Sequence, residues 1–349
     1  MLMEDQKLRY LQNFLQHNQN YCLKDYIQRA KSWEDEARNC YDKQIGLNSD
    51  QFAEMMLLDG ISVIQLFLMF RDHQRRLPND QIFGKPWKFT DVCHDMALLE
   101  NQIPFFVVQK LFEMAFGTHQ HHMLELLELV CLFFKRVMRK EKLPEAVMET
   151  GVKHFVHAIS LSFLPSVRKT PNENHKEMKF SPSVTELMAA GSKCLFDIEF
   201  ENGVLGIPFL LLDDLTETDF RNILAFEQCY CKNRYLVDCM AFMSHLVDTL
   251  GDAELLINKG IIENCLSSKE AAVRLISTLS HENRMSRYYN FNSLSHKLVN
   301  HCQRPNNKWK ATFKRDYCSN PWVVISVIAA GVLLLLTVAQ TVFSALSLA

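Results

Sequence analysis

The sequence predicts a mainly α-helical globular domain with one small β-hairpin and a C-terminal transmembrane helix. Helical periodicity dominates the chain before residue 165 and after residue 218. Residues 194–212 alternate apolar and acidic side chains, as a strand does, and residues 317–349 carry no charge. With 48% hydrophobic residues and 24 Phe, the 349-residue chain has enough apolar surface to bury a core.

Composition excludes several classes of protein. A formal net charge of -2 gives no globally basic surface, so we expect no nucleic-acid partner. The eleven cysteines are scattered without a C-x-x-C pair, unlike a disulfide framework. The first fifteen residues mix acids and bases and lack an apolar stretch, so we expect no cleaved secretory signal. These features predict a body that folds in the cytosol.

The helices of the first half follow from apolar periodicity and from breaks at Pro, Gly and charge. We expect a charged segment at Lys31–Asp42, a loop at Arg71–Trp87, and helices at Leu8–Ile27 (one or two), Asp50–Phe70, Asp91–Asn101, Pro104–Phe116, His122–Lys140 and Pro144–Leu164. Asn48 or Ser49 is placed to cap the helix Asp50–Phe70, whose apolar residues surround most of its circumference. That helix is expected at the centre of the core. Because polar residues such as Glu54 and Asp59 interrupt it, a second membrane span is not expected.

The second half begins after Ser166–Pro182, a polar stretch that reads as an exposed linker. Phe196, Ile198 and Phe200 then alternate with acidic residues before the turn dipeptide Asn202-Gly203, which predicts a hairpin near 194–212. Helical patterns resume at Thr218 and continue to about His301, with breaks expected at Gly251 and Gly260.

The C-terminal segment divides the chain into a soluble body, 1–315, and an anchor, 316–349. The run from Trp322 to Leu346 is roughly 37 Å long as a helix, whereas the hydrocarbon core of a bilayer is about 30 Å thick. Asn320 and Pro321 suit a helix start, and Trp322 suits the membrane interface. A buried core helix is the alternative, although soluble domains seldom need so long an apolar run.

Charge at the flanks predicts the orientation of this span. Lys308, Lys310, Lys314 and Arg315 precede it, and no charge follows it. Because positive flanks stay in the cytoplasm, we expect a single-pass, tail-anchored protein with a cytosolic body. The same basic residues are suited to anionic lipid. The sequence does not decide between the plasma membrane and an endomembrane.

Six segments, taken in order, carry a family resemblance. They are MEDQKLRYLQNFL (3–15), ARNCYDKQIGLNSDQFAEMMLLDG (37–60), DMALLENQIPFFVVQKLF (95–112), VLGIPFLLLDDLTETDFRNILAFEQC (204–229), GIIENCL (260–266) and YCSNPWVVIS (317–326). Together they resemble the plant family called domain of unknown function 247. The resemblance implies a single-pass plant membrane protein with no assigned catalytic activity, and some relatives are implicated in cell recognition.

The chain departs from the family pattern in two places. The usual N-terminal segment, with its I-x-x-V-P and G-P-Y-H elements, is missing, which implies a short member or an incomplete gene model. After Asp59-Gly60 the chain has Ile61 and Ser62, where the family commonly has Cys and Phe. With the N-terminal segment missing, a core partner of the remaining helices is expected to be lost.

Two polar clusters are candidate sites, although helix capping explains them better. Asp95, Glu100, Asn101 and Gln102 lie in an apolar stretch before Pro104, where amides are placed to satisfy the groups at a helix end. The second cluster consists of Arg221, Asn222, Glu227 and Gln228. We interpret these residues likewise, as helix caps and internal ion pairs.

Histidines and cysteines suggest no metal centre. His119, His121 and His122 lack a nearby Cys or carboxylate that completes a familiar ligand set, and Cys229, Cys231 and Cys239 lack zinc-knuckle spacing. His154 and His157, three residues apart, are expected to form a polar stripe between helices. We therefore assign no metal, cofactor or catalytic residue.

No G-x-S-x-G, G-x-x-x-x-G-K-[ST] or H-E-x-x-H motif occurs, so an enzyme is not expected. The sequence predicts a membrane-tethered interaction or recognition module whose partners are the lipid bilayer and an unknown protein. One alternative is an enzyme at the cytosolic membrane face with an unusual site. Another is a degraded copy that has lost its function along with the N-terminal segment.

Overall fold

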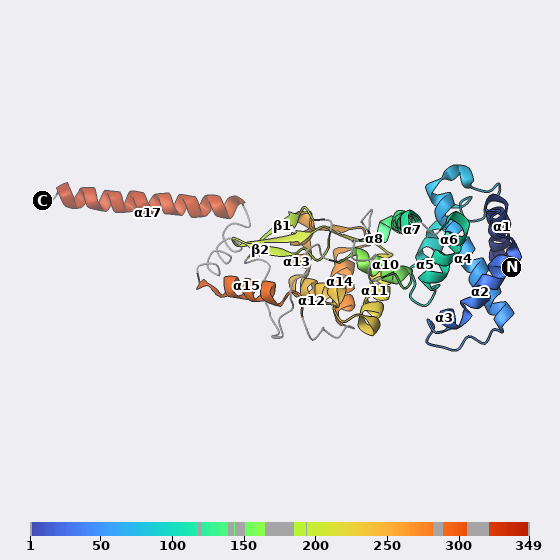
Figure 1. Cartoon of the computed structure of the whole chain (residues 1–349). Helices are drawn as coiled ribbons and strands as arrows, with labels where there is room; N and C mark the ends of the chain where they lie inside the picture. Colours follow the sequence, from blue (N-terminus) through green and yellow to red (C-terminus); the bar gives the residue numbers. More distant parts are fainter. Residues whose placement is uncertain are drawn as a thin grey trace.

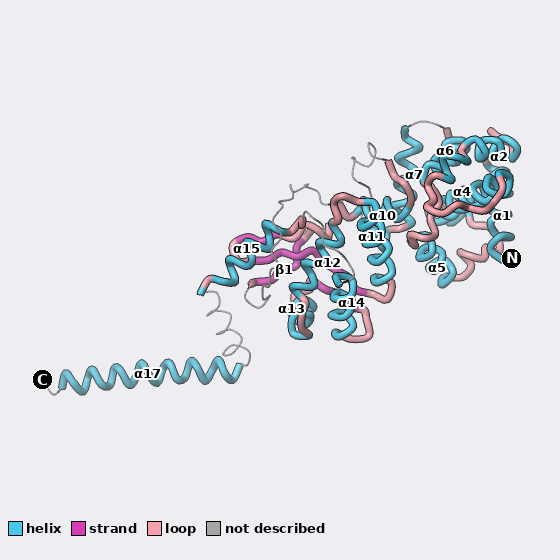
Figure 2. Tube along the Cα trace, turned by 90° about the horizontal axis from the view of Figure 1, so that it is seen from below, coloured by secondary structure: helices cyan, strands magenta, loops and turns pink. Residues whose placement is uncertain are grey.

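The computed structural model describes residues 2–117, 120–138, 143, 151–164, 185–192, 194–281, 289–305 and 321–347. A helical N-terminal half is followed by a half in which helices surround two small sheets (Figures 1 and 2). Buried apolar side chains of both halves form one contiguous cluster, which extends from Tyr10 to Leu298. The predicted, mainly helical fold class is confirmed.

Helix α4 (Ser49–Arg71) is the centre of the N-terminal half. Its N-cap is Asn48, which accepts a hydrogen bond from the Gln51 amide at 2.9 Å while the Gln51 side chain accepts one from the Asn48 amide at 3.2 Å. The helices α1 (Leu2–His17), α2 (Leu23–Ser32), α6 (Phe105–Phe116) and α7 (Gln120–Phe133) pack against it. Most of its side chains are buried, so its expected place at the centre of the core is confirmed.

Gly60 brings α4 and α6 close together. A Cβ atom at this position would lie 2.5 Å from Leu111 Cδ1 and 3.6 Å from Ile103 Cδ1. Because the first distance is shorter than a van der Waals contact, a side chain here would displace Leu111, which is fully buried. The absence of a side chain at Gly60 therefore leaves room for Leu111 where α4 and α6 pack together.

Several helix boundaries differ from those predicted. The remaining elements of this half are α3 (Glu34–Arg38), the 3₁₀ turn η1 (His73–Arg75), α5 (Pro86–Met96), α8 (Lys135–Met138) and α10 (Phe155–Ser162). The predicted helix Asp91–Asn101 is misplaced, because Pro86 occupies the first helical position and starts α5 earlier. The predicted helix His122–Lys140 is interrupted at Phe134. The predicted helix Pro144–Leu164 begins later than expected, because Gly151 has φ +71° and α10 starts only at Phe155. Residues 144–150 lie outside the described residues.

The predicted hairpin is confirmed, but it is shorter than expected. Strands β2 (Glu199–Glu201) and β3 (Val204–Pro208) are antiparallel. Asn202 and Gly203 join them with φ +52° and +85°, the positive values of a type I′ turn. Two parallel pairings that no local pattern predicted add to it. β1 (Glu186–Ala190) pairs with β3, and β4 (Leu210–Leu212) pairs with β5 (Ile262–Asn264).

The last helices of the body cover these sheets (Figure 2). They are α11 (Thr216–Tyr230), α12 (Tyr235–Leu246), α13 (Leu250–Asn258), α14 (Lys269–His281) and α15 (Asn292–Gln303). Gly260 follows α13 with φ +67°, so the break expected there is confirmed. The break expected at Gly251 occurs slightly earlier, at 247–249 between α12 and α13, because Thr249 caps α13 and Gly251 lies in its first turn.

The C-terminal helix α17 runs over Pro321–Ser347. Within its described part, the continuous apolar segment Ile328–Phe343 is shorter than the roughly 20 residues that a span needs. Among the described residues, α4 alone is long and apolar enough to cross a membrane, yet 83% of its most apolar window is buried inside the protein. The structure therefore does not establish the transmembrane part of the predicted fold. The expected linker 166–182 lies outside the described residues.

Phe67 of α4 should be a main contributor to stability. Its ring is fully buried, with ring centroids 4.8 Å from Phe133 and 5.6 Å from Phe155. We predict that Phe67→Ala lowers the free energy of unfolding by about 3–5 kcal/mol, because it leaves a cavity among these rings. Trp87→Ala, at a position 63% exposed, should cost less than about 1 kcal/mol. Urea unfolding followed by circular dichroism measures both, and equal losses would contradict the central role of Phe67.

Candidate functional site

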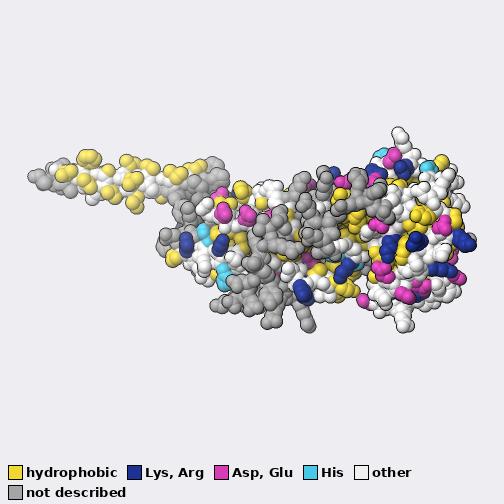
Figure 3. All heavy atoms as spheres, in the orientation of Figure 1, with side chains coloured by type: hydrophobic (Ala, Val, Ile, Leu, Met, Phe, Trp, Pro, Cys, Tyr) yellow, Lys and Arg dark blue, Asp and Glu magenta, His cyan; other side chains and the backbone are white. Residues whose placement is uncertain are grey.

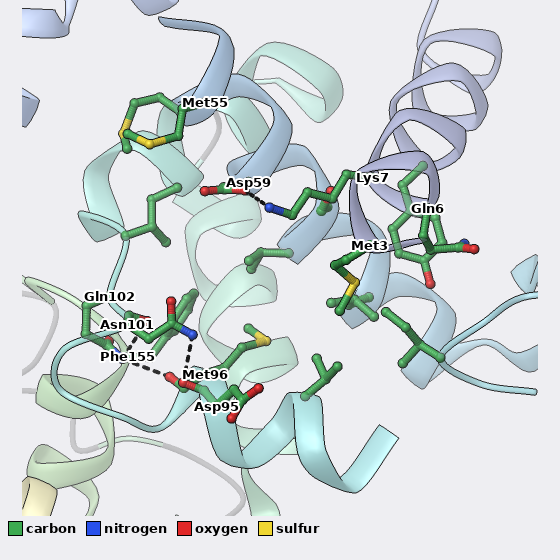
Figure 4. A pocket seen from close by; sticks show the side chains of 18 of the residues that line it. Met3, Gln6, Lys7, Met55, Asp59, Asp95, Met96, Asn101, Gln102 and Phe155 are labelled. Carbon is green, nitrogen blue, oxygen red and sulfur yellow. Dashed lines mark hydrogen bonds and ion pairs between the residues drawn. The ribbon is translucent and has the colours of Figure 1, made fainter. Parts of the chain in front are cut away.

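A half-open cavity of about 410 Å³ lies between α1, α4, α5 and the loop that follows α5 (Figure 4). One face of α4 forms its floor through residues spaced three or four apart, namely Met55, Met56, Asp59, Ser62, Val63 and Leu66. Phe155, at the start of α10, and Ile82 close it from other sides, and both are almost fully buried. The cavity is thus enclosed by elements from distant parts of the N-terminal half.

Two other hollows lie beside the hairpin, and their walls are less suited to enclose a ligand. The first, of about 500 Å³, is lined by exposed Lys297 and Arg304 among others. The second, of about 530 Å³, is lined by exposed Glu199 and Glu201 among others. Because, of these three hollows along the described residues, the cavity on α4 is the one with a wall formed largely of buried apolar side chains, we take it as the candidate site.

An ion pair joins α1 to α4 at the edge of the cavity. Lys7 Nζ lies 2.7 Å from Asp59 Oδ1 (Figure 4). It also lies 3.1 Å from Glu4 Oε1. Partial burial favours the neutral amine, but the hydrogen bonds and charges of the two carboxylates outweigh this effect, so the pKa of Lys7 is raised. Lys7 is therefore a cation held by α1 and α4 together.

Asp80 fixes the wall that α1 forms behind this edge. Its carboxylate accepts hydrogen bonds from Tyr10 Oη at 2.8 Å and Gln6 Nε2 at 3.2 Å, and from the amides of Ile82 and Phe83 at 2.8 Å each. Asp80, Gln6 and Tyr10 are all buried. Burial and the charge of Asp80 raise the pKa of Tyr10, so the phenol stays protonated and keeps donating.

The first predicted cluster lies at the mouth of the cavity. Asp95, Glu100, Asn101 and Gln102 all line it. Asn101 Nδ2 donates to the Asp95 carbonyl at 3.0 Å, and Gln102 Nε2 donates to the Met96 and Leu98 carbonyls at 2.8 and 2.6 Å. The capping role predicted for the two amides is confirmed, and the same bonds shape the opening of the cavity.

Sequence reasoning missed Ser62 as a site residue, although it noted the departure from the family pattern there. Ser62 lines the cavity and is 6% exposed. Its Oγ atom is buried and has no hydrogen-bond partner within the described part of the chain. A buried hydroxyl without a partner is costly, so Ser62 is a position where a bound molecule would gain a hydrogen bond.

The second predicted cluster does not form a site. Asn222 Oδ1 accepts from the Leu99 amide at 2.6 Å, and Arg221 pairs with Glu217 at 3.0 Å. Glu227 accepts the Leu236 and Val237 amides at 3.0 Å each, at the start of α12. Burial raises the pKa of Glu227 to about 7 against the effect of these hydrogen bonds. The backbone oxygen of Gln228 accepts a hydrogen bond from Arg234. Helix capping and ion pairing therefore account for these residues, as predicted.

His154 and His157, predicted to form a polar stripe between helices, lie at the start of α10, where it packs against α11. His154 Nδ1 accepts the His157 amide at 3.2 Å, and His157 Nδ1 accepts the Lys153 amide at 3.1 Å. Both rings pack on Phe226, with centroids 5.0 and 5.2 Å away. Burial, then nearby positive charge, lowers the pKa of each histidine to about 4. Both rings are therefore neutral in the folded protein near pH 7.

The other predicted residues do not gather. His119 and the side chains of His121 and His122 lie outside the described residues. Cys229 is exposed, whereas Cys239 is fully buried. No group of three His, Cys, Asp or Glu suited to a metal occurs among the residues that the structure describes. The flanking residues Lys308, Lys310, Lys314 and Arg315 also lie outside them, as does the side chain of Trp322.

The two histidines should make stability depend on pH. Below pH 6.5 the unfolded histidines bind protons that the folded ones do not bind until about pH 4, so acidification favours unfolding in this window. We predict that, between pH 7 and 5, the free energy of unfolding falls by about 3–4 kcal/mol less in the double variant His154→Asn, His157→Asn than in the natural chain. The Asn oxygens replace the Nδ1 acceptors but do not titrate.

Urea unfolding at each pH measures this difference. The opposite effect of Glu227 cancels, because that residue is present in both proteins. Exposed His73, changed to Asn, is the matched control and should leave the pH dependence unchanged. Parallel pH profiles for the natural chain and the double variant would contradict the prediction.

Comparison with known proteins places the chain in a family. The family model DUF247, described as plant protein of unknown function, matches residues 1–336. The UPF0481 protein At3g47200 of Arabidopsis thaliana is 26% identical over 382 aligned residues, which cover 99% of this chain and 79% of that protein. A second UPF0481 protein of Arabidopsis thaliana, At3g02645, is 24% identical over 111 residues, which cover 32% of this chain and 20% of that protein. No solved structure matches. Because the family model covers nearly the whole chain, the protein belongs to the DUF247 family of plant proteins of unknown function.

Proposed function

We propose that this protein is a membrane-tethered interaction or recognition module, anchored by α17 with its body in the cytosol. The observation that carries the proposal is the exposure of apolar side chains along α17. Leu335 and Phe343 are 69% and 72% exposed, and Figure 3 shows a helix of apolar and uncharged side chains. Such a surface is unfavourable in water, whereas a bilayer is a suitable solvent for it.

Length and flanking charge support the anchor and its direction. The apolar segment Ile328–Phe343 alone is shorter than a span, but it lies within the continuous, uncharged helix Pro321–Ser347, which at about 1.5 Å per residue is long enough for a hydrocarbon core of about 30 Å. The basic residues between 308 and 315 precede it, and uncharged residues follow it. Because positively charged flanks are retained in the cytoplasm, the body lies in the cytosol.

The arrangement of polar groups favours interaction over catalysis. At the cavity, Lys7 is paired with Asp59, and the amides of Asn101 and Gln102 hold backbone carbonyls. An enzyme at the cytosolic membrane face is the second candidate, because these groups and Asp95 surround one cavity. Proximity labelling from the tethered body would identify the protein partner and the membrane.

Protease protection tests the topology. In sealed vesicles with the cytosolic side outward, we predict that added protease degrades the body and leaves a fragment containing α17. The reason is that the bilayer shields only the span and the short C-terminus. Immunoblotting with tags at both ends measures the fragments. A body that survives until detergent is added would contradict the cytosolic placement.

The basic flank tests the orientation separately. We predict that changing Lys308, Lys310, Lys314 and Arg315 to Gln produces a mixed orientation, because the charge difference across the span is lost. Four exposed lysines far from α17 in sequence are the matched control and should have no effect when changed to Gln: Lys24, Lys43, Lys232 and Lys259. A glycosylation acceptor added at the C-terminus reports orientation in microsomes, and an unchanged pattern in the flank variant counts against the proposal.

A further inference from the structure

We propose that the cavity on α4 binds a small, uncharged, mainly apolar molecule that carries a hydrogen-bond acceptor oxygen, such as an alcohol, ketone or ester. This binding site goes beyond the proposed tethering and does not depend on it. Its volume of about 410 Å³ falls within the range of protein ligand pockets, about 300–1,000 Å³. The size suits a small organic molecule, and a folded peptide segment would not fit.

The lining sets the apolar character of the ligand. The wall includes Met55 of α4, Met96 of α5 and Met3 of α1 (Figure 4). Met56 of α4 also contributes to it. Methionine side chains adjust to irregular apolar shapes, because they are unbranched and polarizable. A wall of this kind accepts aliphatic groups of varied outline, which favours a flexible hydrocarbon over a rigid polar ring.

The charged residues that line the cavity favour an uncharged ligand. Lys7, the one cation among the described residues that line the cavity, is already paired with Asp59 at 2.7 Å. The remaining acidic groups, Asp95 and Glu100, are exposed at the mouth and repel an anion. A charged ligand group would also lose its hydration against apolar walls. Neutral molecules therefore bind best, and anions bind worst.

Ser62 sets the position of the acceptor oxygen. Its hydroxyl is buried in the cavity wall and has no hydrogen-bond partner within the described residues. A hydroxyl or carbonyl oxygen of the ligand would accept this hydrogen bond and remove the cost of the unpaired group. Since Ser62 lies in the middle of the rigid helix α4, the donor is held in place before the ligand arrives.

Photolabelling of the full chain in lipid nanodiscs tests this site. The probe is 3-azioctanol, an eight-carbon alcohol with a photoreactive diazirine, and mass spectrometry locates the adducts. We expect adducts on cavity residues such as Met55 and Met96, which excess octan-1-ol suppresses at least fivefold and octanoate suppresses less than twofold. Adducts confined to α17 or scattered over the surface would overturn the proposal, as would equal competition by octanoate.

Variants of Ser62 distinguish two effects on binding, namely the filling of the cavity and the loss of the hydrogen-bond donor. Ser62→Phe fills the volume and should reduce cavity adducts at least fivefold, whereas Ser62→Ala keeps the volume and should reduce them two- to fivefold. Exposed Ser32→Phe is the matched control and should have no effect. Adducts on α17 report delivery of the probe and should be the same in every variant.

A second filling variant guards against misfolding. Met55 is half-buried at the cavity, so Met55→Trp fills it from another position. Circular dichroism and the melting temperature show which variants are folded. If a folded Ser62→Phe or Met55→Trp protein retains the natural yield of cavity adducts, the proposed site is wrong.

Discussion

The described N-terminal half depends on the burial of α4, a helix that has almost no polar face. Its backbone groups bond within the helix, but its side chains need apolar neighbours on nearly every side. Four helices supply them, and the phenylalanine rings around Phe67 fill the space between. The composition that makes α4 a core helix also resembles that of a membrane span. Burial distinguishes it from α17, whose described side chains are exposed.

The cavity on α4 is coupled to the second half of the chain through the loop after α5. The Leu99 amide donates to Asn222 of α11 at 2.6 Å, and Gln102 Oε1 accepts the Val156 amide of α10 at 3.2 Å. Arg136 adds an ion pair to Asp219 at 2.5 Å, across the same two halves. Burial raises the pKa of Asp219, and the Arg136 charge opposes this effect. The loop that forms the cavity mouth is therefore held from both halves.

Local patterns predicted the elements whose cause is local. The Asn202-Gly203 turn, the Asn48 cap and the apolar circumference of α4 all depend on neighbouring residues, and the structure has each of them. The parallel pairing of Leu210–Leu212 with Ile262–Asn264 was missed, because it joins segments about fifty residues apart and leaves no short-range signal. Of the candidate site, the amides at the mouth were predicted. The cavity itself was not, because it depends on how α1, α4 and α5 pack.

The position of the cavity bears on the source of its ligand. The body ends with α15, and in both Figures 1 and 2 this helix lies at the opposite end of the body from α1. A chain tethered beyond α15 would therefore hold the cavity away from the bilayer, so its ligand would arrive through water.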